Sequence, residues 1–157
     1  MKGISLDAGF MMEALKEAIR AEEEGEVPVG AVLVQEGKVI AREHNRCIQK
    51  NDPTAHAEIL ALRYAGEKIK NYRLPGITLF ATIEPCPMCA GAILNSRIKR
   101  VVYGARDPKS GSDGSVVNIL RNRKFNHMLE VVRGIKEDEC IAVLRDFFLK
   151  KRKKNKN

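Results

Sequence analysis

Two short motifs constrain the fold more than any other feature of this sequence. The first covers residues 54–58 and reads TAHAE, and the second covers residues 85–89 and reads PCPMC. Each motif stands where the surrounding pattern predicts the start of a helix. Together they supply one histidine and two cysteines, a set that suits a single metal ion. The fold is therefore expected to place the two helix starts next to each other.

The predicted metal ligands are His56, Cys86 and Cys89. Thiolates and a neutral imidazole suit Zn²⁺, and a helix N-terminus stabilises a thiolate through its dipole and free N–H groups. Three protein ligands leave a fourth position for water, whose pKa zinc lowers towards about 7. Glu58 is expected to accept the proton of that water and pass it to a substrate. Because residues i and i+2 do not share a helix face, Glu58 is poorly placed as a further ligand.

Other interpretations of these motifs remain open but explain less. A Cys-x-x-Cys pair alone is also typical of thioredoxin-like redox chemistry, which leaves His56 and Glu58 without a role. A closed structural zinc site needs a fourth ligand, for which Cys47 or His44 is available. Cys140 stands among apolar residues and is expected to be a small core residue.

The length and composition suit one globular domain spanning residues 1–157. The chain has 157 residues, of which 44% are hydrophobic and 31% are charged, so wholesale disorder is excluded. No uncharged run approaches the ~18 apolar residues that a membrane helix needs. Charged residues interrupt the apolar positions near the N-terminus, so a signal peptide is not expected and the protein is predicted to be cytoplasmic. In that reducing compartment its four cysteines are poor candidates for disulfides.

Positive charge is concentrated at the C-terminus. Residues 145–157 hold seven Lys or Arg and one acid, which is +6 of the formal net charge of +8. Two phenylalanines, Phe147 and Phe148, stand next to this basic tail, which runs from about residue 150 to residue 157. The combination indicates a polyanionic partner. A solvated, frayed helix end is the alternative interpretation.

Hydrophobic periodicity and turn residues predict alternating helices and strands, which favours an α/β layered domain around one sheet. Thr54 is predicted as the N-cap of the helix that carries the first motif. A turn at Glu36-Gly37 predicts antiparallel pairing of the two strands around it. The expected helices cover residues 7–24, 55–69, 87–96, 116–120 and 136–151, and the expected strands cover residues 29–34, 38–43, 77–82, 100–103 and 130–133, with a polar loop at 44–53.

The H-x-E and P-C-x-x-C pair is the signature of zinc-dependent nucleobase deaminases, and the resemblance extends along the chain. The segments that carry it are residues 26–32 (EVPVGAV), 45–46 (NR), 52–59 (DPTAHAEI), 71–74 (NYRL), 84–92 (EPCPMCAGA), 96–98 (SRI), 104–107 (GARD) and 146–148 (DFF). In these segments the sequence resembles the bacterial tRNA-specific adenosine deaminases of the cytidine deaminase-like superfamily.

That resemblance implies a three-layer α/β/α cytidine deaminase-like fold with a five-stranded mixed sheet, in a single zinc-dependent deaminase domain. It implies a hydrolase with one Zn²⁺ per subunit, held by His56, Cys86 and Cys89, and Glu58 as proton shuttle. Zinc-activated water would attack C6 of a flipped-out adenine, converting adenosine to inosine at the wobble position of a tRNA anticodon, with tRNA-Arg as the expected substrate. A homodimer is implied, in which partner residues help to shape each site.

The same resemblance suggests substrate contacts. Asn45 and Ala57 are expected to contact the base, although Asn45 could also simply bond the backbone of its own loop. Asp107 is expected near the preceding nucleotide, where accepting a bond from a 2′-OH would favour RNA. Phe147 is expected either to stack on a splayed base or to pack in the core. The tail residues Lys150, Lys151, Arg152 and Lys153 are expected to bind phosphates of the anticodon stem-loop.

Two rival functions remain. The same zinc site serves deaminases of free guanine, cytosine or nucleosides, although the basic tail favours a polynucleotide. A non-catalytic RNA-binding module with structural zinc is the other. Glu58 argues against this module, because a structural site has no use for a carboxylate beside an open position.

Overall fold

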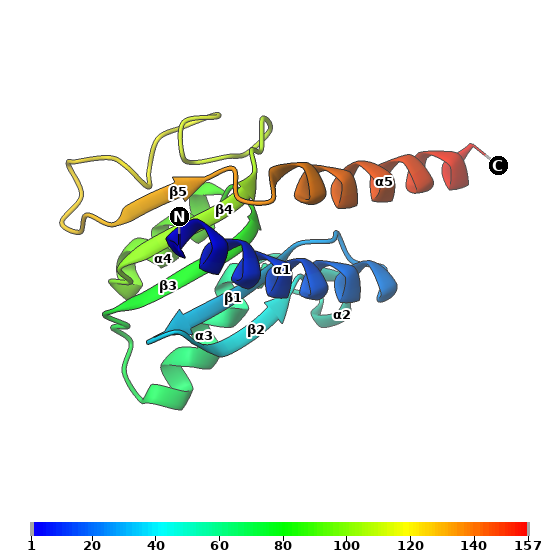
Figure 1. The fold of residues 1–157 in the computed structure, drawn as a ribbon. Helices are drawn as coiled ribbons and strands as arrows, with labels where there is room; N and C mark the ends of the chain where they lie inside the picture. The colour runs from blue at the N-terminus through cyan, green and yellow to red at the C-terminus, as the bar shows by residue number, and fades with distance from the viewer. Residues whose placement is uncertain (1, 157) are drawn as a thin grey trace.

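The computed structural model describes residues 2–156, with side chains from Leu6 onward. Helices and strands alternate along the chain, as the periodicity predicts, and form layers around one five-stranded sheet (Figure 1). The elements are α1 (Lys2–Glu23), β1 (Gly30–Gln35), β2 (Lys38–His44), α2 (Cys47–Lys50), α3 (Ala57–Ile69), β3 (Ile77–Ile83), α4 (Pro87–Ser96), β4 (Arg100–Ala105), β5 (Glu130–Arg133) and α5 (Glu137–Asn155).

The sheet is mixed and has the order β2-β1-β3-β4-β5. β1 pairs antiparallel with both β2 and β3, whereas β3, β4 and β5 run parallel. Glu36 and Gly37, which join β1 to β2, have φ angles of 50° and 76°. Positive φ at both positions is what a two-residue hairpin turn needs, and the predicted antiparallel hairpin is confirmed.

Helices cover both faces of the sheet, because alternate residues of each strand point to opposite sides. On one face, Val32 and Phe80 pack with Met11 of α1 and Cys140 of α5. On the other, Leu33 and Leu79 pack with residues of α3 and α4. The α/β/α layering and the burial of Cys140 are both as predicted. None of the helices in the described part of the chain is long and apolar enough to cross a lipid bilayer.

Two local predictions are wrong, because other hydrogen bonds replace those of the expected helix starts. Thr54 is not the N-cap of α3, because its hydroxyl donates to Asp52, and His56 occupies the cap position. Residues 116–120 form irregular structure rather than a helix, with an isolated β-bridge between Asp113 and Asn118. The N–H groups of Val116 and Ile119 donate back to the carbonyls of Gly111 and Ser112, so the bonding pattern of an α-helix does not form there. The predicted loop at 44–53 contains one short helix, α2.

The carboxyl ends of β3, β4 and β5 lie at one edge of the sheet, since these strands are parallel. In open α/β sheets this edge is where ligands bind. The second motif follows β3 directly, and α4 begins at Pro87 within it. The topology therefore places the predicted metal ligands at the edge most suited to a site.

Candidate active site

His56, Cys86 and Cys89 meet at the N-termini of α3 and α4. Their ligand atoms lie within 4.8 Å of one another, and the His56 Nδ1 atom is 3.6 Å from the Cys86 sulfur and 3.4 Å from the Cys89 sulfur. His56 and Cys86 are the N-cap residues of their helices, both with extended backbone. Two helix N-termini thus converge on one point, as the two motifs predict, and their dipoles favour thiolate there.

Electrostatics within this group favour binding of a cation. Hydrogen bonds from Cys89 and His56 lower the pKa of Cys86 to about 4, so this thiol is ionised at neutral pH. The pKa of Cys89 is raised, because it shares its proton with Cys86 and is buried. The hydrogen bond with Cys86 also raises the pKa of His56. The group thus contains one thiolate, one thiol and one imidazole in contact. A metal ion can displace the remaining protons and bind to these donors.

Neither candidate for a fourth ligand belongs to this group. His44 is buried between two carboxylates, with Nδ1 3.0 Å from Glu17 and Nε2 2.9 Å from Glu24. Cys47 lies at the first residue of α2 and lines the cavity described below. Among the described residues the metal-binding group has three members. Three ligands fit an open, catalytic type of site.

Glu58 lies on the first turn of α3, beside the metal-binding group. Its side chain is 2% exposed, and its Oε1 atom has no hydrogen-bond partner among the described residues. Burial raises the pKa of this carboxyl group. Buried polar atoms in proteins are almost always paired, so an unpaired carboxylate oxygen facing a cavity indicates a place for a polar group that the protein itself does not supply.

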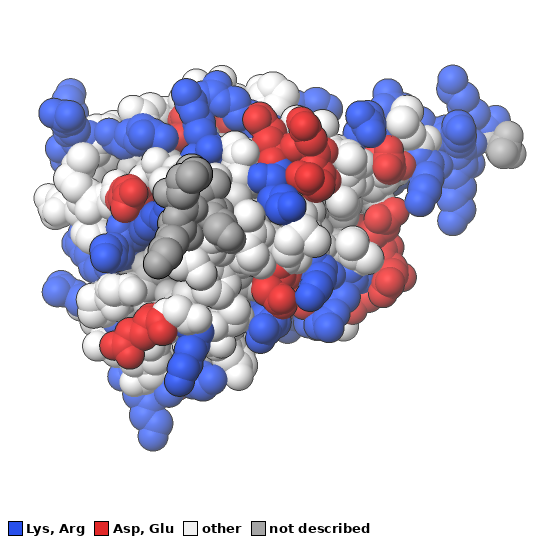
Figure 2. All heavy atoms as spheres, in the orientation of Figure 1, with Lys and Arg blue, Asp and Glu red and all other residues white. Residues whose placement is uncertain are grey.

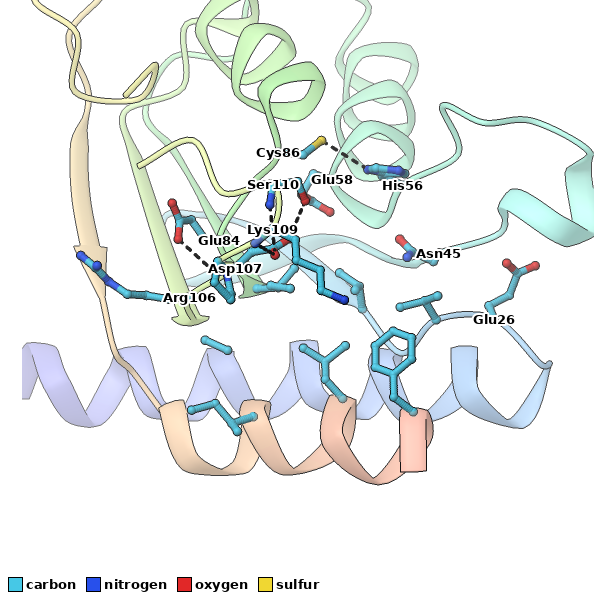
Figure 3. Close-up of a pocket in the computed structure, with 18 of the residues that line it drawn as sticks. Glu26, Asn45, His56, Glu58, Glu84, Cys86, Arg106, Asp107, Lys109 and Ser110 are labelled. Atoms are coloured by element: carbon cyan, nitrogen blue, oxygen red, sulfur yellow. Dashed lines mark hydrogen bonds between the residues drawn. The ribbon is translucent and has the colours of Figure 1, made fainter. Parts of the chain in front are cut away.

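A cavity of about 590 Å³ opens in front of Glu58 and is lined mainly by apolar atoms. This volume is in the range typical of small-molecule sites. Its walls come from distant parts of the chain (Figure 3): the segment before β1, the loop after β2, the segment after β4, and α5. Residues on these walls include Val29, Asn45, Cys47, Ile48, Ile83, Arg106, Asp107, Lys109, Ile141, Leu144 and Phe148.

Asn45 lies on the cavity wall, and its Oδ1 atom accepts a hydrogen bond from the N–H of Ala57 at 2.9 Å. Thr54 is predicted to cap the N-terminus of α3, but Asn45 has that role instead, because it satisfies a free N–H of the first turn. Ala57 itself is fully buried and does not line the cavity. Its predicted contact with substrate stays a prediction, and its N–H holds Asn45 in place.

Asp107 lies at the cavity wall and organises its own loop. Its Oδ1 atom accepts the N–H of Lys109 at 3.0 Å and of Ser110 at 3.3 Å, and its Oδ2 atom accepts the Ser110 hydroxyl at 2.7 Å. A carboxylate has about four acceptor positions. Asp107 therefore has one acceptor position beyond these three bonds, which shape the segment after β4.

Glu84 is a site residue that the sequence interpretation missed. Its carboxylate is 1% exposed and accepts the N–H groups of Asp107, Asp113 and Ser115 together with the Ser115 hydroxyl. The loop packs so closely that a Cβ on Gly111 would overlap the Glu84 carboxylate. Glu84 thus ties the loop after β4 to the strand that leads into Cys86. An acid directly before the cysteine motif, at the end of an apolar strand, was the available signal.

Glu26 plays a similar part at the other side of the cavity and was also missed. It is 2% exposed, and its two carboxylate oxygens accept the N–H groups of Ile48 at 3.1 Å and Gln49 at 2.8 Å. These bonds fix α2, whose Cys47 and Ile48 line the cavity. The signal here was an acid next to the apolar segment at residues 27–34.

Phe147 and Phe148 lie on different faces of α5, and the predicted stacking of Phe147 on a splayed base stays a prediction. Phe148 lines the cavity with Ile141, Leu144 and Arg145, which is one face of α5 at helical spacing. Successive residues of a helix point about 100° apart, so Phe147 faces elsewhere. Its ring is half-buried, packs edge-on against Phe148 at 5.2 Å and lies 5.9 Å from the Lys151 ammonium.

The basic tail forms the last turns of α5, which project away from the rest of the molecule (Figure 1). Lys and Arg side chains gather on this projecting end (Figure 2). The predicted phosphate-binding residues, Lys150, Lys151, Arg152 and Lys153, are all exposed. The ammonium of Lys150 is 3.5 Å from the Glu22 carboxylate, and the other three make no ion pair with described residues.

Comparison with known proteins agrees with this geometry. The model of the MafB19-like deaminase family matches residues 6–152. The tRNA-specific adenosine deaminase of Bacillus subtilis is 51% identical over 96% of this chain and 93% of its own length. The enzyme of the same name from Haemophilus influenzae is 50% identical over 96% of this chain and 87% of its own length.

Solved structures lead to the same family. A structure from work on A-to-I editing by tRNA:A34 deaminases is 48% identical, covers 87% of this chain and 99% of its own, and superposes with a TM-score of 0.84. A guanine deaminase from Nitrosomonas europaea is 26% identical, with a TM-score of 0.79 over 89% of this chain and 83% of its own. The cytidine deaminase-like fold expected from the sequence is therefore confirmed, and the chain belongs to the family of tRNA-specific adenosine deaminases.

Proposed function

We propose that this protein converts adenosine to inosine at the wobble position of a tRNA anticodon, with tRNA-Arg among its substrates and Zn²⁺ as its cofactor. The observation that carries the proposal is the unpaired, buried Oε1 of Glu58, which faces the cavity beside His56, Cys86 and Cys89. Residues 1–157 act as one deaminase domain, in the cytoplasm.

The donor set fits zinc. His56, Cys86 and Cys89 supply one nitrogen and two sulfurs from two helix N-termini, and one sulfur is already ionised. His56, Cys86 and Cys89 would hold one Zn²⁺ per subunit, and the bound ion would lower the pKa of a water molecule beside it.

Glu58 moves the protons of the reaction. Its Oε1 atom accepts a proton from the attacking water and delivers it to the purine ring nitrogen next to C6. The water oxygen adds to C6, and Glu58 carries the second proton of the water to the exocyclic amino group. The bond from C6 to that nitrogen then breaks, and ammonia leaves. Water and adenosine are consumed, and inosine and ammonia are formed. Burial of Glu58 excludes bulk water from this transfer.

Asn45 and the cavity walls orient the base. Because Oδ1 of Asn45 is bonded to Ala57, its amide N–H₂ is the part available to donate to an acceptor on the flipped-out base. Apolar side chains of Val29, Ile83 and Phe148 line the space that the ring occupies.

Asp107 distinguishes RNA from DNA. The acceptor position left by its bonds to Lys109 and Ser110 takes a hydrogen bond from the 2′-OH of the nucleotide before the target. This gives a carboxylate a favourable role next to RNA, whose phosphates would otherwise repel it.

The partner is the anticodon stem-loop, and the functional assembly is a homodimer in which partner residues help to shape each site. Lys150, Lys151, Arg152 and Lys153 contact RNA phosphates without reading sequence. Phe147 lies next to Lys151 and stacks on a splayed loop base. Removing residues 150–157 is expected to weaken tRNA binding and flatten its dependence on salt, and light scattering of the purified protein should give twice the chain mass.

Deamination of a free base is the second candidate, favoured by the likeness to the guanine deaminase of N. europaea. The two are separated by supplying zinc-loaded protein with an arginine-tRNA anticodon stem-loop bearing adenosine at the wobble position, and in parallel with free guanine and cytosine. Inosine appears as a mass rise of about one dalton, because NH is replaced by O. Turnover of the stem-loop alone supports the proposal, whereas turnover of a free base alone overturns it.

A further inference from the structure

The catalytic cavity occupies only part of the sheet edge formed by the ends of β3, β4 and β5. Cys86 follows β3, and Arg106 and Asp107 follow β4. β5 ends at Arg133. Because β5 pairs in parallel with β4, this end lies at the same edge of the sheet, one strand beyond the end of β4. No residue after β5 until Ile141 lines the cavity, so the function proposed above leaves the β5 end of this edge unused.

Two solvent-facing hollows lie at this unused end, and arginines line both. Arg106 and Arg133 line each hollow, and Arg121 joins them in one. Arg106 also lines the catalytic cavity. Figure 3 shows its side chain extending from the segment after β4 towards the end of β5, away from Glu58. We call these three residues the arginine rim. It begins where the cavity ends.

The charge of the arginine rim is only partly balanced. Arg121 pairs with the buried carboxylate of Asp113 at 2.7 Å, whereas Arg106 and Arg133 make no ion pair with any described residue. Glu137 is the one unpaired acid that lines the hollows. Two free guanidinium groups on one exposed hollow, with planar donor forks, suit a phosphate group.

Helix α5 runs from the arginine rim past the cavity to the basic tail, so the rim and the tail lie on two sides of the cavity. Glu137, at the start of α5, lines a rim hollow. Ile141 to Phe148, further along the helix, line the cavity, and the exposed lysines begin at Lys150. At 1.5 Å per residue, the start of α5 and its lysines are roughly 20 Å apart. An RNA strand whose target base enters the cavity would therefore meet cations both before and after that base.

We propose that the arginine rim binds a backbone phosphate of the RNA strand, on the side of the target nucleotide opposite to the α5 lysines. This inference rests on the proposed function, because it needs a polynucleotide substrate. A free base has no phosphate and would make no use of the rim.

Arg133 is the residue to change. Arg106 lines the catalytic cavity, and loss of Arg121 would leave buried Asp113 without its partner. Arg133 is exposed, and its side chain makes no hydrogen bond or ion pair with the described residues, so Arg133→Gln removes one charge and leaves the fold intact. Lys38→Gln is the matched control. Lys38 is an exposed residue at the β1–β2 turn, at the opposite edge of the sheet.

The measurement is binding and turnover of the wobble-adenosine stem-loop at several salt concentrations. Loss of one phosphate contact makes the slope of log affinity against log salt concentration shallower by about 0.7. At 0.1 M salt this corresponds to an affinity about fivefold weaker. For Arg133→Gln we expect this change in slope, a similar rise in KM and an unchanged kcat, with Lys38→Gln like wild type. A wild-type slope and KM for Arg133→Gln overturn the inference, while turnover of the stem-loop by wild type still supports the proposed function. If wild type does not turn over the stem-loop, the proposed function fails, and the binding slope alone still tests the rim.

Discussion

The Oδ1 atom of Asn45 accepts a hydrogen bond from the N–H of Ala57 at 2.9 Å, which joins the loop after β2 to the first residue of α3. This bond fixes which end of the Asn45 amide faces the cavity. It also satisfies a helix N–H that lacks a partner within the helix. One side chain therefore contributes both to the stability of α3 and to the donor groups of the site.

These two contributions can be separated by two substitutions of Asn45. Asn45→Asp keeps an oxygen for the Ala57 N–H but loses the amide donor, so we expect near wild-type stability and a clear loss of kcat/KM on the stem-loop. Asn45→Ala loses both, and its unfolding free energy should fall by about 1 kcal/mol as well. Chemical denaturation and steady-state kinetics check this. Wild-type kinetics for Asn45→Asp would show that the amide donor makes no contact with substrate.

Glu84→Ala is expected to destabilise the protein by more than the loss of a single hydrogen bond would. The substitution leaves the N–H groups of Asp107, Asp113 and Ser115 without their acceptor, at about 1 kcal/mol or more for each buried group. We expect a loss of roughly 3 kcal/mol in unfolding free energy, together with loss of activity. Ser115→Ala removes only one hydroxyl bond to Glu84 and should cost about 1 kcal/mol. Equal losses for the two variants would show that Glu84 does not organise this loop.

Asp107→Asn is expected to relax the preference for RNA over DNA. An asparagine keeps one oxygen for the N–H groups of Lys109 and Ser110, and its amide can donate to the Ser110 hydroxyl. The loop is therefore retained, while the carboxylate acceptor for a 2′-OH is lost. Turnover of matched RNA and DNA stem-loops gives the ratio, and the same ratio as wild type would remove this role of Asp107.

Cys140 makes stability depend on pH in the alkaline range. Burial raises the pKa of its thiol to about 12, from an ordinary value of 9.0. The unfolded chain ionises this thiol above pH 9 and the folded chain does not, so the stabilising effect is complete below pH 9 and is lost as pH rises towards 12. Between pH 7 and pH 10 this one group should lower the unfolding free energy by about 1.4 kcal/mol.

Urea unfolding of wild type and Cys140→Ala at the two pH values isolates this effect. The wild-type protein should lose about 1.4 kcal/mol more than Cys140→Ala between pH 7 and pH 10. Cys47→Ala, which removes a thiol that is only partly buried, should change the pH dependence less. Parallel pH profiles for wild type and Cys140→Ala would contradict the assignment.

The sequence predicts those parts of the fold that local chemistry determines. The bounds of α4 and β5 agree with the expected ranges to the residue, because Pro87 starts the helix and a short apolar run marks the strand. The convergence of His56, Cys86 and Cys89 follows from their motifs. In each case the residues that decide the structure lie within a few positions of one another.

The errors occur where distant residues compete with local preference. Thr54 has the ordinary character of an N-cap, but its near neighbour Asp52 accepts its hydroxyl, and Asn45, 12 residues before Ala57, serves α3 instead. Glu84 and Glu26 were missed because their partners are backbone N–H groups 22 to 31 residues away, which no local pattern contains. The sequence predicts that Phe147 and Phe148 face different sides of α5, but it does not define that Phe148 is the one that lines the cavity.

The central claim is that Glu58 moves the protons of deamination within an intact site. Glu58→Ala tests it most directly, with Glu67→Ala, an exposed glutamate on the same helix, as the matched control. Both zinc-loaded variants are assayed on the wobble-adenosine stem-loop, with zinc content and RNA binding measured alongside. We predict that Glu58→Ala keeps one zinc per chain and binds the stem-loop but forms inosine at least 100-fold more slowly, the size of effect that general acid–base catalysis contributes, while Glu67→Ala is like wild type. Inosine formed by Glu58→Ala at a rate within tenfold of wild type would contradict the account.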